Sequence, residues 1–406
     1  MRRAMQTVGW GLYLASSWTW CIGMFLPTLL LRWWGWPGFL AFAVPNVLGC
    51  ALFGYVLSPE TSRGFCLRNA GALRAFAWAT VAYQAWFVQW ATTGTPVASA
   101  LAPVCALLPL AFLFFPGGRG FWPMAGSLAF AASMACFVWN GAGALTAPLG
   151  PTTQPPSTLL WAAPFMAFGF ALCPYLDPTF HRALQQSPSR HAFAVFGVAF
   201  ALALLFAAST YDGRVDGVAV PVPVPVWLQW TLQTTFTSAA MIAVTGPLAK
   251  NAWPLAPTEF PAPSRGASPM GRLIRRLGSP PLAVVVGPLL LLALTYAAVR
   301  VPALLPAATL LPAGGATPWS AGESTYLRWL GLYGVLFPAL VLFRVRHVPR
   351  WRQWLSILVA AVLAERGMVG GNMPLLAASL GVILLTGLMG PSQSGGTREI
   401  ARTNPR

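Results

Sequence analysis

Residues 7–31 read TVGWGLYLASSWTWCIGMFLPTLLL, a stretch without one charged side chain. It is longer than the roughly 20 apolar residues that a helix needs to cross the hydrocarbon of a bilayer. Similar stretches recur along the whole chain. The pattern predicts an all-α polytopic membrane protein with about 12 transmembrane helices. The expected spans are 7–31, 37–57, 72–93, 97–115, 121–142, 157–180, 190–210, 225–248, 280–300, 325–343, 353–369 and 373–390.

The composition excludes an ordinary soluble protein. Of the 406 residues, 56% are hydrophobic and 8% are charged, whereas about 25% charged residues are typical of soluble domains. The net charge of +17 is spread over short loops and builds no folded basic face of the kind that binds nucleic acid. We therefore expect no nucleic-acid partner. We expect these charges to face the bilayer, with anionic lipids at the cytoplasmic surface.

The basic residues also predict the orientation. If the N-terminus is cytoplasmic, most of the 25 basic residues fall in inner segments, and the outer segments hold only Arg32, Arg214, Arg300, Arg328 and Arg366. The positive-inside rule then places both termini in the cytoplasm. Arginine greatly outnumbers lysine, and Ala and Pro are abundant, which suggests a GC-rich bacterial genome. We expect a multi-pass protein of the bacterial inner membrane.

Two spans carry signals of an interrupted helix. In the first, Ser16–Gly23 brings hydroxyls and a glycine to membrane depth, and Pro27 follows. In the sixth, Pro174 and Pro178 flank Asp177, the one clear carboxylate within a span. A discontinuous helix leaves backbone carbonyls free to hold a cation or a solute. Asp177 itself has two interpretations: it caps a restarted helix or pairs with Arg182 or His181, or it acts in gating or ion coupling.

The two interrupted spans suggest an internal repeat. Helices 1 and 6 are corresponding members of two halves of five helices, and an odd number makes the second half inverted. The expected organisation is a ten-helix core at 1–348, divided into halves 1–150 and 151–348. Two additional helices follow at 349–391, and a disordered cytoplasmic tail at 392–406. The loop 250–279 contains a basic amphipathic turn that we expect on the inner leaflet.

Two further spans contribute polar side chains. In the eighth, Thr234, Thr237 and Ser238 recur at helical spacing, and their oxygens suit sodium as a possible coupling ion. The alternative interpretation is ordinary packing of Ser and Thr against a neighbouring helix. In the third, Tyr83 and Gln84 are candidates for a pocket wall. Together with the first and sixth spans, these residues outline a central site.

Three short stretches resemble a known family. The run Ser17–Trp20 (SWTW) resembles the start of sodium/solute symporters of the amino acid–polyamine–organocation superfamily. The stretch from Asp177 to Arg182 is similar to the family segment that closes with Gln-Arg, with His181 in place of the glutamine. Thr237 and Ser238 fall where that fold places the hydroxyls of its sodium site. The resemblance implies the leucine-transporter fold, alternating access and a solute held between helices 1, 3, 6 and 8.

The function that we expect is secondary active transport of a small neutral or zwitterionic solute, coupled to sodium or to protons. Coupling or gating is assigned to Asp177, His181 and Arg182, and a possible sodium site to Thr234, Thr237 and Ser238. The expected solute-binding residues are Ser16, Ser17, Trp20, Gly23, Tyr83, Gln84, Phe168, Cys173 and Tyr175.

One alternative is a quinone-binding membrane anchor of an electron-transfer complex, because Glu365-Arg366 is loosely similar to a helix end in the membrane subunits of polysulfide reductases. A membrane scaffold or sensor without transport is another. No motif of metalloproteases, serine hydrolases, kinases or P-loop ATPases occurs in the sequence. We therefore expect no enzyme activity and, apart from a coupling ion, no cofactor.

Overall fold

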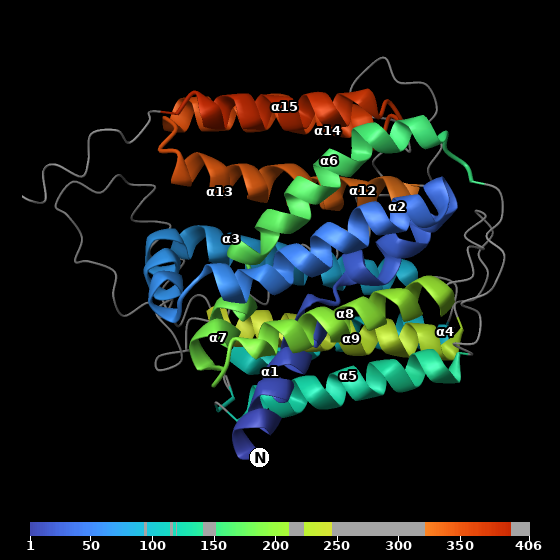
Figure 1. The fold of residues 1–406 in the computed structure, drawn as a ribbon. Coiled ribbons are helices and arrows are strands. Elements are labelled where there is room, and N and C mark those ends of the chain that lie inside the picture. Colours follow the sequence, from blue (N-terminus) through green and yellow to red (C-terminus); the bar gives the residue numbers. More distant parts are fainter. Residues whose placement is uncertain are drawn as a thin grey trace, which may run out of the picture.

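The computed structural model describes residues 1–92, 96–113, 117–118, 120–140, 152–210, 223–245 and 321–390, and within these ranges it is all-helical without a strand (Figure 1). The expected span at 280–300, the loop at 250–279 and the tail at 392–406 lie outside the described residues. The α-helices are α1 (Arg2–Trp18), α2 (Cys21–Val56), α3 (Pro59–Ala91), α4 (Pro96–Leu107), α5 (Phe121–Trp139), α6 (Pro156–Leu172), α7 (Pro178–Gln186), α8 (His191–Thr210), α9 (Val224–Thr245), α12 (Ala321–Gly331), α13 (Phe337–Val345), α14 (Arg350–Met368) and α15 (Pro374–Leu388).

Three shorter elements continue these helices. The 3₁₀-helix η1 (Leu108–Leu113) extends α4, the 3₁₀-helix η3 (Cys173–Tyr175) follows α6, and the π-helix η5 (Leu332–Leu336) joins α12 to α13. Two long helices are bent within their bounds. Gly35 has a φ of 67° and divides α2 into 21–34 and 36–56, and Asn69 bends α3. A residue with a side chain would be strained at the positive φ of Gly35.

Six segments of the described chain are long and apolar enough to cross a membrane: Cys21–Val56, Pro96–Leu113, Phe121–Trp139, Pro156–Tyr175, His191–Ala208 and Gly322–Val345. The helix Pro374–Leu388 is apolar but shorter. The prediction of a helical protein with several apolar, membrane-type helices is confirmed. The two expected spans at 7–31 and 37–57 fall on α1 and the two parts of α2.

Polarity is distributed as expected of a protein surrounded by lipid. Large apolar side chains are exposed along the outer faces of several helices, as at Leu52, Leu128, Val198, Leu358 and Leu385. Buried polar side chains gather on α1, α3, α7 and α9 instead. Because hydrocarbon offers no hydrogen bonds, helices that satisfy their own backbone are the structures that suit this environment.

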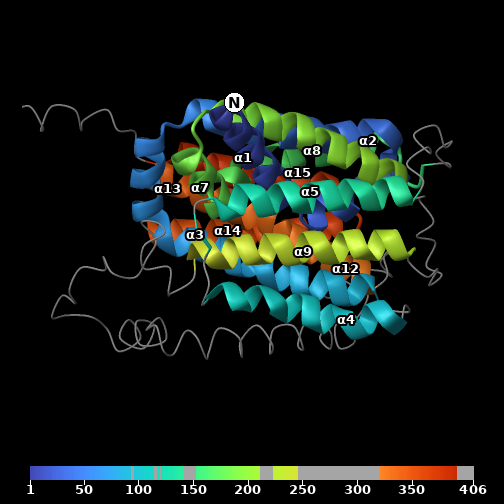
Figure 2. The same cartoon turned by 90° about the horizontal axis from the view of Figure 1, so that it is seen from below.

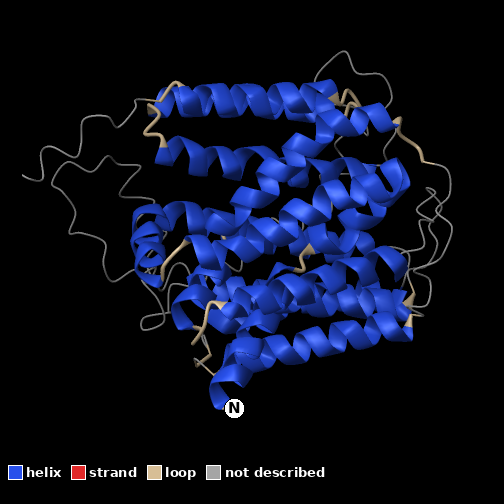
Figure 3. Ribbon diagram, in the orientation of Figure 1, coloured by secondary structure: helices blue, strands red, loops and turns tan. Residues whose placement is uncertain are grey.

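The helices run side by side in a bundle, with α14 and α15 at one edge and α1 and α5 near the other (Figure 1). Seen from below, α4 lies along a further edge, beside α9 and α3 (Figure 2). Helix α1 packs on α5 and α8, α2 packs on α6 and α8, and α3 packs on α9. Helix α6 also packs on η5 and α13. Almost every described ribbon in Figure 3 is helix, and most of the described loops lie at the ends of the bundle.

Candidate functional site

The first interruption lies at Thr19 and Trp20, between α1 and α2. The ψ of Thr19 is 73° and the ψ of Trp20 is 177°, so neither residue is helical. The backbone carbonyls nearby are bound by side chains: Thr19 Oγ1 donates to the Ala15 carbonyl at 2.7 Å, and Trp20 Nε1 donates to the Ser17 carbonyl at 2.7 Å. The prediction of an interrupted first helix is confirmed.

The second interruption lies between α6 and α7. After the 3₁₀ turn η3, Leu176 and Asp177 leave the helix, and α7 restarts at Pro178. Asp177 is the N-cap of α7: its Oδ1 accepts from the Thr179 backbone N–H and from Thr179 Oγ1, both at 2.6 Å. An Asp N-cap and a proline at the first helical position are a favoured helix start. The interrupted sixth helix and the capping interpretation of Asp177 are both confirmed.

The two interruptions touch each other. Ser17 Oγ lies 3.1 Å from Thr179 Oγ1, and both hydroxyls are buried. Trp18 packs edge-on against Phe180 with ring centroids 4.9 Å apart. The end of α1 and the start of α7 therefore form one junction, although they are far apart in the sequence.

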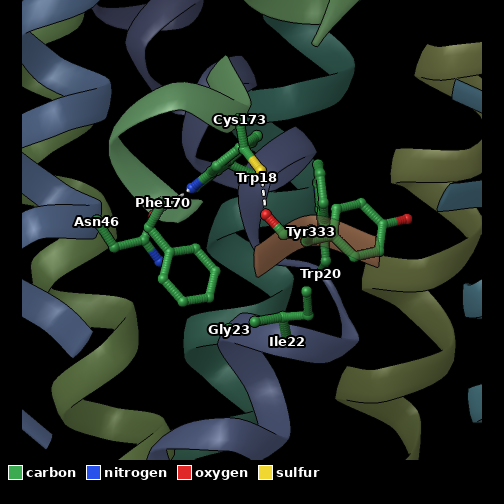
Figure 4. Close-up of a pocket in the computed structure, with 8 residues that line it drawn as sticks. All are labelled: Trp18, Trp20, Ile22, Gly23, Asn46, Phe170, Cys173 and Tyr333. Carbon is green, nitrogen blue, oxygen red and sulfur yellow. Dashed lines mark hydrogen bonds between the residues drawn. The ribbon is translucent and has the colours of Figure 1, made fainter. Parts of the chain in front are cut away.

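A small cavity lies beside this junction (Figure 4). Its volume of about 10 Å³ is on the order of one water molecule. No charged side chain lines it, and aromatic rings make up half of the lining. The lining residues are Trp18, Trp20, Ile22, Gly23, Asn46, Phe170, Cys173 and Tyr333.

Hydrogen bonds fix several of these walls. Trp18 Nε1 donates to Asn46 Oδ1 at 2.8 Å. The Cys173 thiol donates to the Tyr333 carbonyl at 3.2 Å, the dashed line of Figure 4, and Tyr333 belongs to the π-helix η5. π-Helical turns inside α-helices are frequent at functional sites. The cavity is thus built from both interrupted helices, from the second part of α2 and from η5.

Of the expected solute-binding residues, the structure brings Trp20, Gly23 and Cys173 to the cavity wall. Ser16 and Ser17 lie in the junction beside it, where Ser16 Oγ donates to the Gly126 carbonyl at 3.0 Å. The others do not line the cavity. Tyr83 and Gln84 are buried on α3, Phe168 packs at the edge of the core, and Tyr175 packs against Phe53.

Asn46, Phe170 and Tyr333 complete the wall and were not expected. Asn46 had a signal in the sequence, because it is a carboxamide within the apolar stretch 37–57. Phe170 and Tyr333 had none, since aromatic residues are common in every span. The burial of Gln84 has no structural explanation, because both polar atoms of its fully buried amide lack a hydrogen-bond partner.

The expected cation ligands are only partly brought together. Thr237 Oγ1 on α9 donates to the Ser16 carbonyl at 3.1 Å, so α9 meets the first interrupted helix. Thr234 Oγ1 instead donates to carbonyls of its own helix. Ser238 is buried next to Thr237 on α9. The two oxygens that the structure brings together here are the Ser16 carbonyl and the hydroxyl of Thr237.

His181 and Arg182 lie deep on α7. Gln185 Nε2 donates to Ser62 Oγ, which lies 2.8 Å from His181 Nδ1, and His181 Nε2 lies 3.0 Å from the Tyr175 carbonyl. A neutral imidazole with its proton on Nε2 satisfies this chain. The Arg182 guanidinium lies 5.0 Å from the ring centroid of Trp122, a cation–π contact.

An ion pair joins the first interrupted helix to α12. Arg32 Nη1 lies 3.6 Å from Glu323 Oε1. The segment before α6 crosses the same place, since the backbone N–H groups of Thr153 and Gln154 donate to the carbonyls of Arg32 and Trp33, both at 3.0 Å. These contacts close the end of the first helix that lies away from α7. A second pair, Arg328 with Glu365 at 2.9 Å, joins α12 to α14.

These features define a helical membrane protein with a closed, aromatic cavity between two interrupted helices. Comparisons with known protein families, with characterised proteins and with solved structures found no match for the chain.

Proposed function

We propose that this protein is a secondary active transporter that moves a small neutral or zwitterionic solute by alternating access. The observation that carries the proposal is that two interrupted helices meet at Ser17 and Thr179 and line one cavity. Interrupted helices at a midplane site are a recurring way to bind solutes and ions in transporters. The cavity wall has no charged side chain, which favours a solute without net charge.

The packing pattern supports an inverted five-plus-five repeat. We number the spans 1 (α1 and 21–34), 2 (36–56), 3 (α3), 5 (α5), 6 (α6 and α7), 7 (α8), 8 (α9) and 10 (α12 to α13). Exchange of 1 with 6, 2 with 7, 3 with 8 and 5 with 10 turns the contact of α1 with α5 into that of α6 with η5 and α13. The same exchange turns the contact of α1 with α8 into the contact of α6 with α2. It also turns the contact of α3 with α7 into the contact of α9 with α1. Each of these contacts occurs.

Glycines make two of these exchanged contacts close. Gly126 of α5 packs directly on Tyr13 of α1, and a Cβ on Gly169 of α6 would lie 3.0 Å from Gly334 Cα in η5. In both contacts, of span 1 with span 5 and of span 6 with span 10, a glycine allows the two helices to approach closely. With the twelve spans read from the sequence, this pattern supports a leucine-transporter-like fold. The excess of arginine in the expected inner segments supports cytoplasmic termini, and the composition supports a bacterial inner membrane.

Alternating access requires a gate on each side of the cavity. We propose that the pair Arg32–Glu323 belongs to the outer gate, because it joins spans 1 and 10 above the cavity. The contact of Ser17 with Thr179 belongs to the inner gate, with the first part of span 1 as the moving element. We assign the possible sodium site to the Ser16 carbonyl and the hydroxyls of Thr237 and Ser238, with a smaller role for Thr234.

One contact bears on the quinone-anchor alternative. Glu365, whose dipeptide with Arg366 suggested it, accepts two hydrogen bonds from Arg328 and so has a structural role. Binding of a solute to the purified protein tests the proposal directly, because a ligand that binds the folded state raises the melting temperature. We expect stabilisation by one class within a panel of neutral and zwitterionic metabolites. Co-purifying quinone or iron–sulfur subunits, with no stabilising solute, would overturn the proposal.

A further inference from the structure

Asp177 has one carboxylate oxygen that the cap of α7 does not use. Oδ1 accepts two hydrogen bonds from Thr179, and the backbone N–H of Phe180 also faces the carboxylate. The buried Oδ2 has no partner at hydrogen-bond geometry. The residue as a whole is 0% exposed. An ionised carboxylate at membrane depth is costly unless a cation or several donors compensate it. The free oxygen therefore needs an explanation.

No cation supplies that compensation in the described part of the chain, where the ion pairs are Arg32–Glu323 and Arg328–Glu365. Arg182, on the same helix, directs its guanidinium to Trp122 and interacts with Tyr13 of α1. His181, also on α7, is held between Ser62 of α3 and the Tyr175 carbonyl. Helix α9, which packs on α7, has no titratable side chain. The titratable groups within electrostatic reach are uncharged when protonated: Tyr13 on α1, Cys50 on α2, Cys173 in η3 and Tyr333 in η5.

The carboxyl group of Asp177 is also connected to α1, the proposed moving element. Thr179 Oγ1 donates its one proton to Asp177 Oδ1 and lies 3.1 Å from Ser17 Oγ. The Ser17 proton is shared between this contact and the Leu14 carbonyl at 3.2 Å. A continuous chain of hydrogen bonds thus runs from Ser17 at the first interruption to Asp177 at the second. A change of charge at Asp177 alters the strength of this chain, because hydrogen bonds to charged acceptors are stronger than those to neutral ones.

We propose that Asp177 is a proton-binding site that couples proton movement to the transport cycle, in addition to the sodium site of the proposed function, on which this inference rests. Uptake of a proton from water forms an O–H bond at Oδ2 and neutralises the carboxylate. Release returns the proton to water and restores the negative charge. In the closed state seen here the carboxyl is protonated. Separation of α1 from α7 exposes it to water and allows the proton to leave.

Infrared spectroscopy of the reconstituted full-length protein tests the site without any solute. The C=O stretch of a protonated carboxylic acid is distinct from the bands of a carboxylate. We expect an acid band at neutral pH in the wild type and its loss in Asp177→Asn. Asn is as good an N-cap as Asp, so this variant keeps the start of α7. Glu60→Gln, which removes an exposed carboxylate, should leave the band unchanged. Absence of the band in the wild type, or its persistence in Asp177→Asn, would overturn the proposal.

A transport assay is the second test of the proton site. A gradient of one pH unit supports about a tenfold accumulation of a solute that moves with one proton. Asp177→Asn should lose this accumulation and keep counterflow exchange of the same solute, while Asp177→Glu should keep both. Accumulation in Asp177→Asn equal to that of the wild type would contradict the proton site. If no variant and no wild-type protein exchanges any solute, the transporter proposal fails, and the infrared band still decides whether Asp177 binds a proton.

Discussion

Ser17 Oγ lies 3.1 Å from Thr179 Oγ1, and this contact joins the two places where helices of the bundle are interrupted. Both hydroxyls are fully buried, and each sits within two residues of a helix end. The contact joins two segments that are far apart in the sequence through buried polar groups. Any separation of α1 from α7 breaks it.

The Ser17–Thr179 bond should appear as a coupling energy. We expect Ser17→Ala and Thr179→Val to destabilise the protein, and the double variant to lose less than the sum of the two. A net coupling of about 1 kcal/mol is typical of one buried hydrogen bond. Unfolding in mixed micelles measures the cycle. Ser127→Ala, which removes a hydroxyl bonded within its own helix, should show no coupling with Thr179→Val. Additive effects of the Ser17 and Thr179 changes would show that the two hydroxyls do not interact.

Gly23 lines the cavity, and a Cβ there would already contact Phe200 and Leu204 of α8. A leucine side chain must therefore displace these residues or extend into the cavity. We expect Gly23→Leu to abolish solute binding and transport, because the cavity has a volume of only about 10 Å³. Gly381→Leu is the matched control, since a side chain at Gly381 would enter open space on α15. Both variants gain helix propensity. Uptake assays and melting curves separate a blocked site from a misfolded one. Equal activity of Gly23→Leu and the wild type would place the solute elsewhere.

If the Arg32–Glu323 pair is a gate, its removal should expose the cavity. In a variant whose only cysteine is Cys173, we expect Glu323→Gln to increase labelling by a membrane-impermeant maleimide. Loss of a partly exposed pair worth up to ~1 kcal/mol changes the open population about fivefold. Glu365→Gln, which breaks the pair between α12 and α14, should leave the labelling rate unchanged. If both changes raise the rate equally, Arg32–Glu323 is not a specific gate.

The sodium assignment predicts an order among three hydroxyls. Sodium should raise the melting temperature of the wild type relative to potassium, since a ligand stabilises the state that it binds. Thr237→Val and Ser238→Ala should lose this effect. Thr234→Val should keep most of it, because the Thr234 hydroxyl is already bonded to its own helix. An undiminished sodium effect in Ser238→Ala and Thr237→Val would show that these hydroxyls do not bind sodium.

The sequence predicted the positions of the helix breaks better than their causes. Pro174, Pro178 and Asp177 mark the second interruption, and the structure has it there. In the first span we expected Pro27 to contribute, yet Pro27 lies inside α2 and the interruption falls at Thr19 and Trp20. Side-chain hydrogen bonds to backbone carbonyls define that break. Both bonds are local, but Ser and Thr side chains also bond to the preceding turn inside unbroken helices, so the residue types alone do not mark the break.

The cavity wall was predictable only in part. Trp20, Gly23 and Cys173 belong to the interrupted segments, and the interruptions themselves pointed to them. Tyr333 reaches the cavity because a π-helical turn places its carbonyl beside Cys173. Tyr83 was expected at the site but stacks on Trp329 instead, with ring centroids 5.2 Å apart. Polarity within a span marks a residue as interior, and only the packing decides which interior surface it joins.

Uptake into proteoliposomes tests the central claim, that two interrupted helices form the solute site of a transporter. The measurement compares accumulation of labelled neutral and zwitterionic solutes by the wild type, Gly23→Leu and protein-free vesicles, with and without ion gradients. We predict that the wild type accumulates one solute class in a gradient-dependent way and that Gly23→Leu does not. Folded wild-type protein that accumulates no solute beyond the protein-free vesicles would contradict the claim.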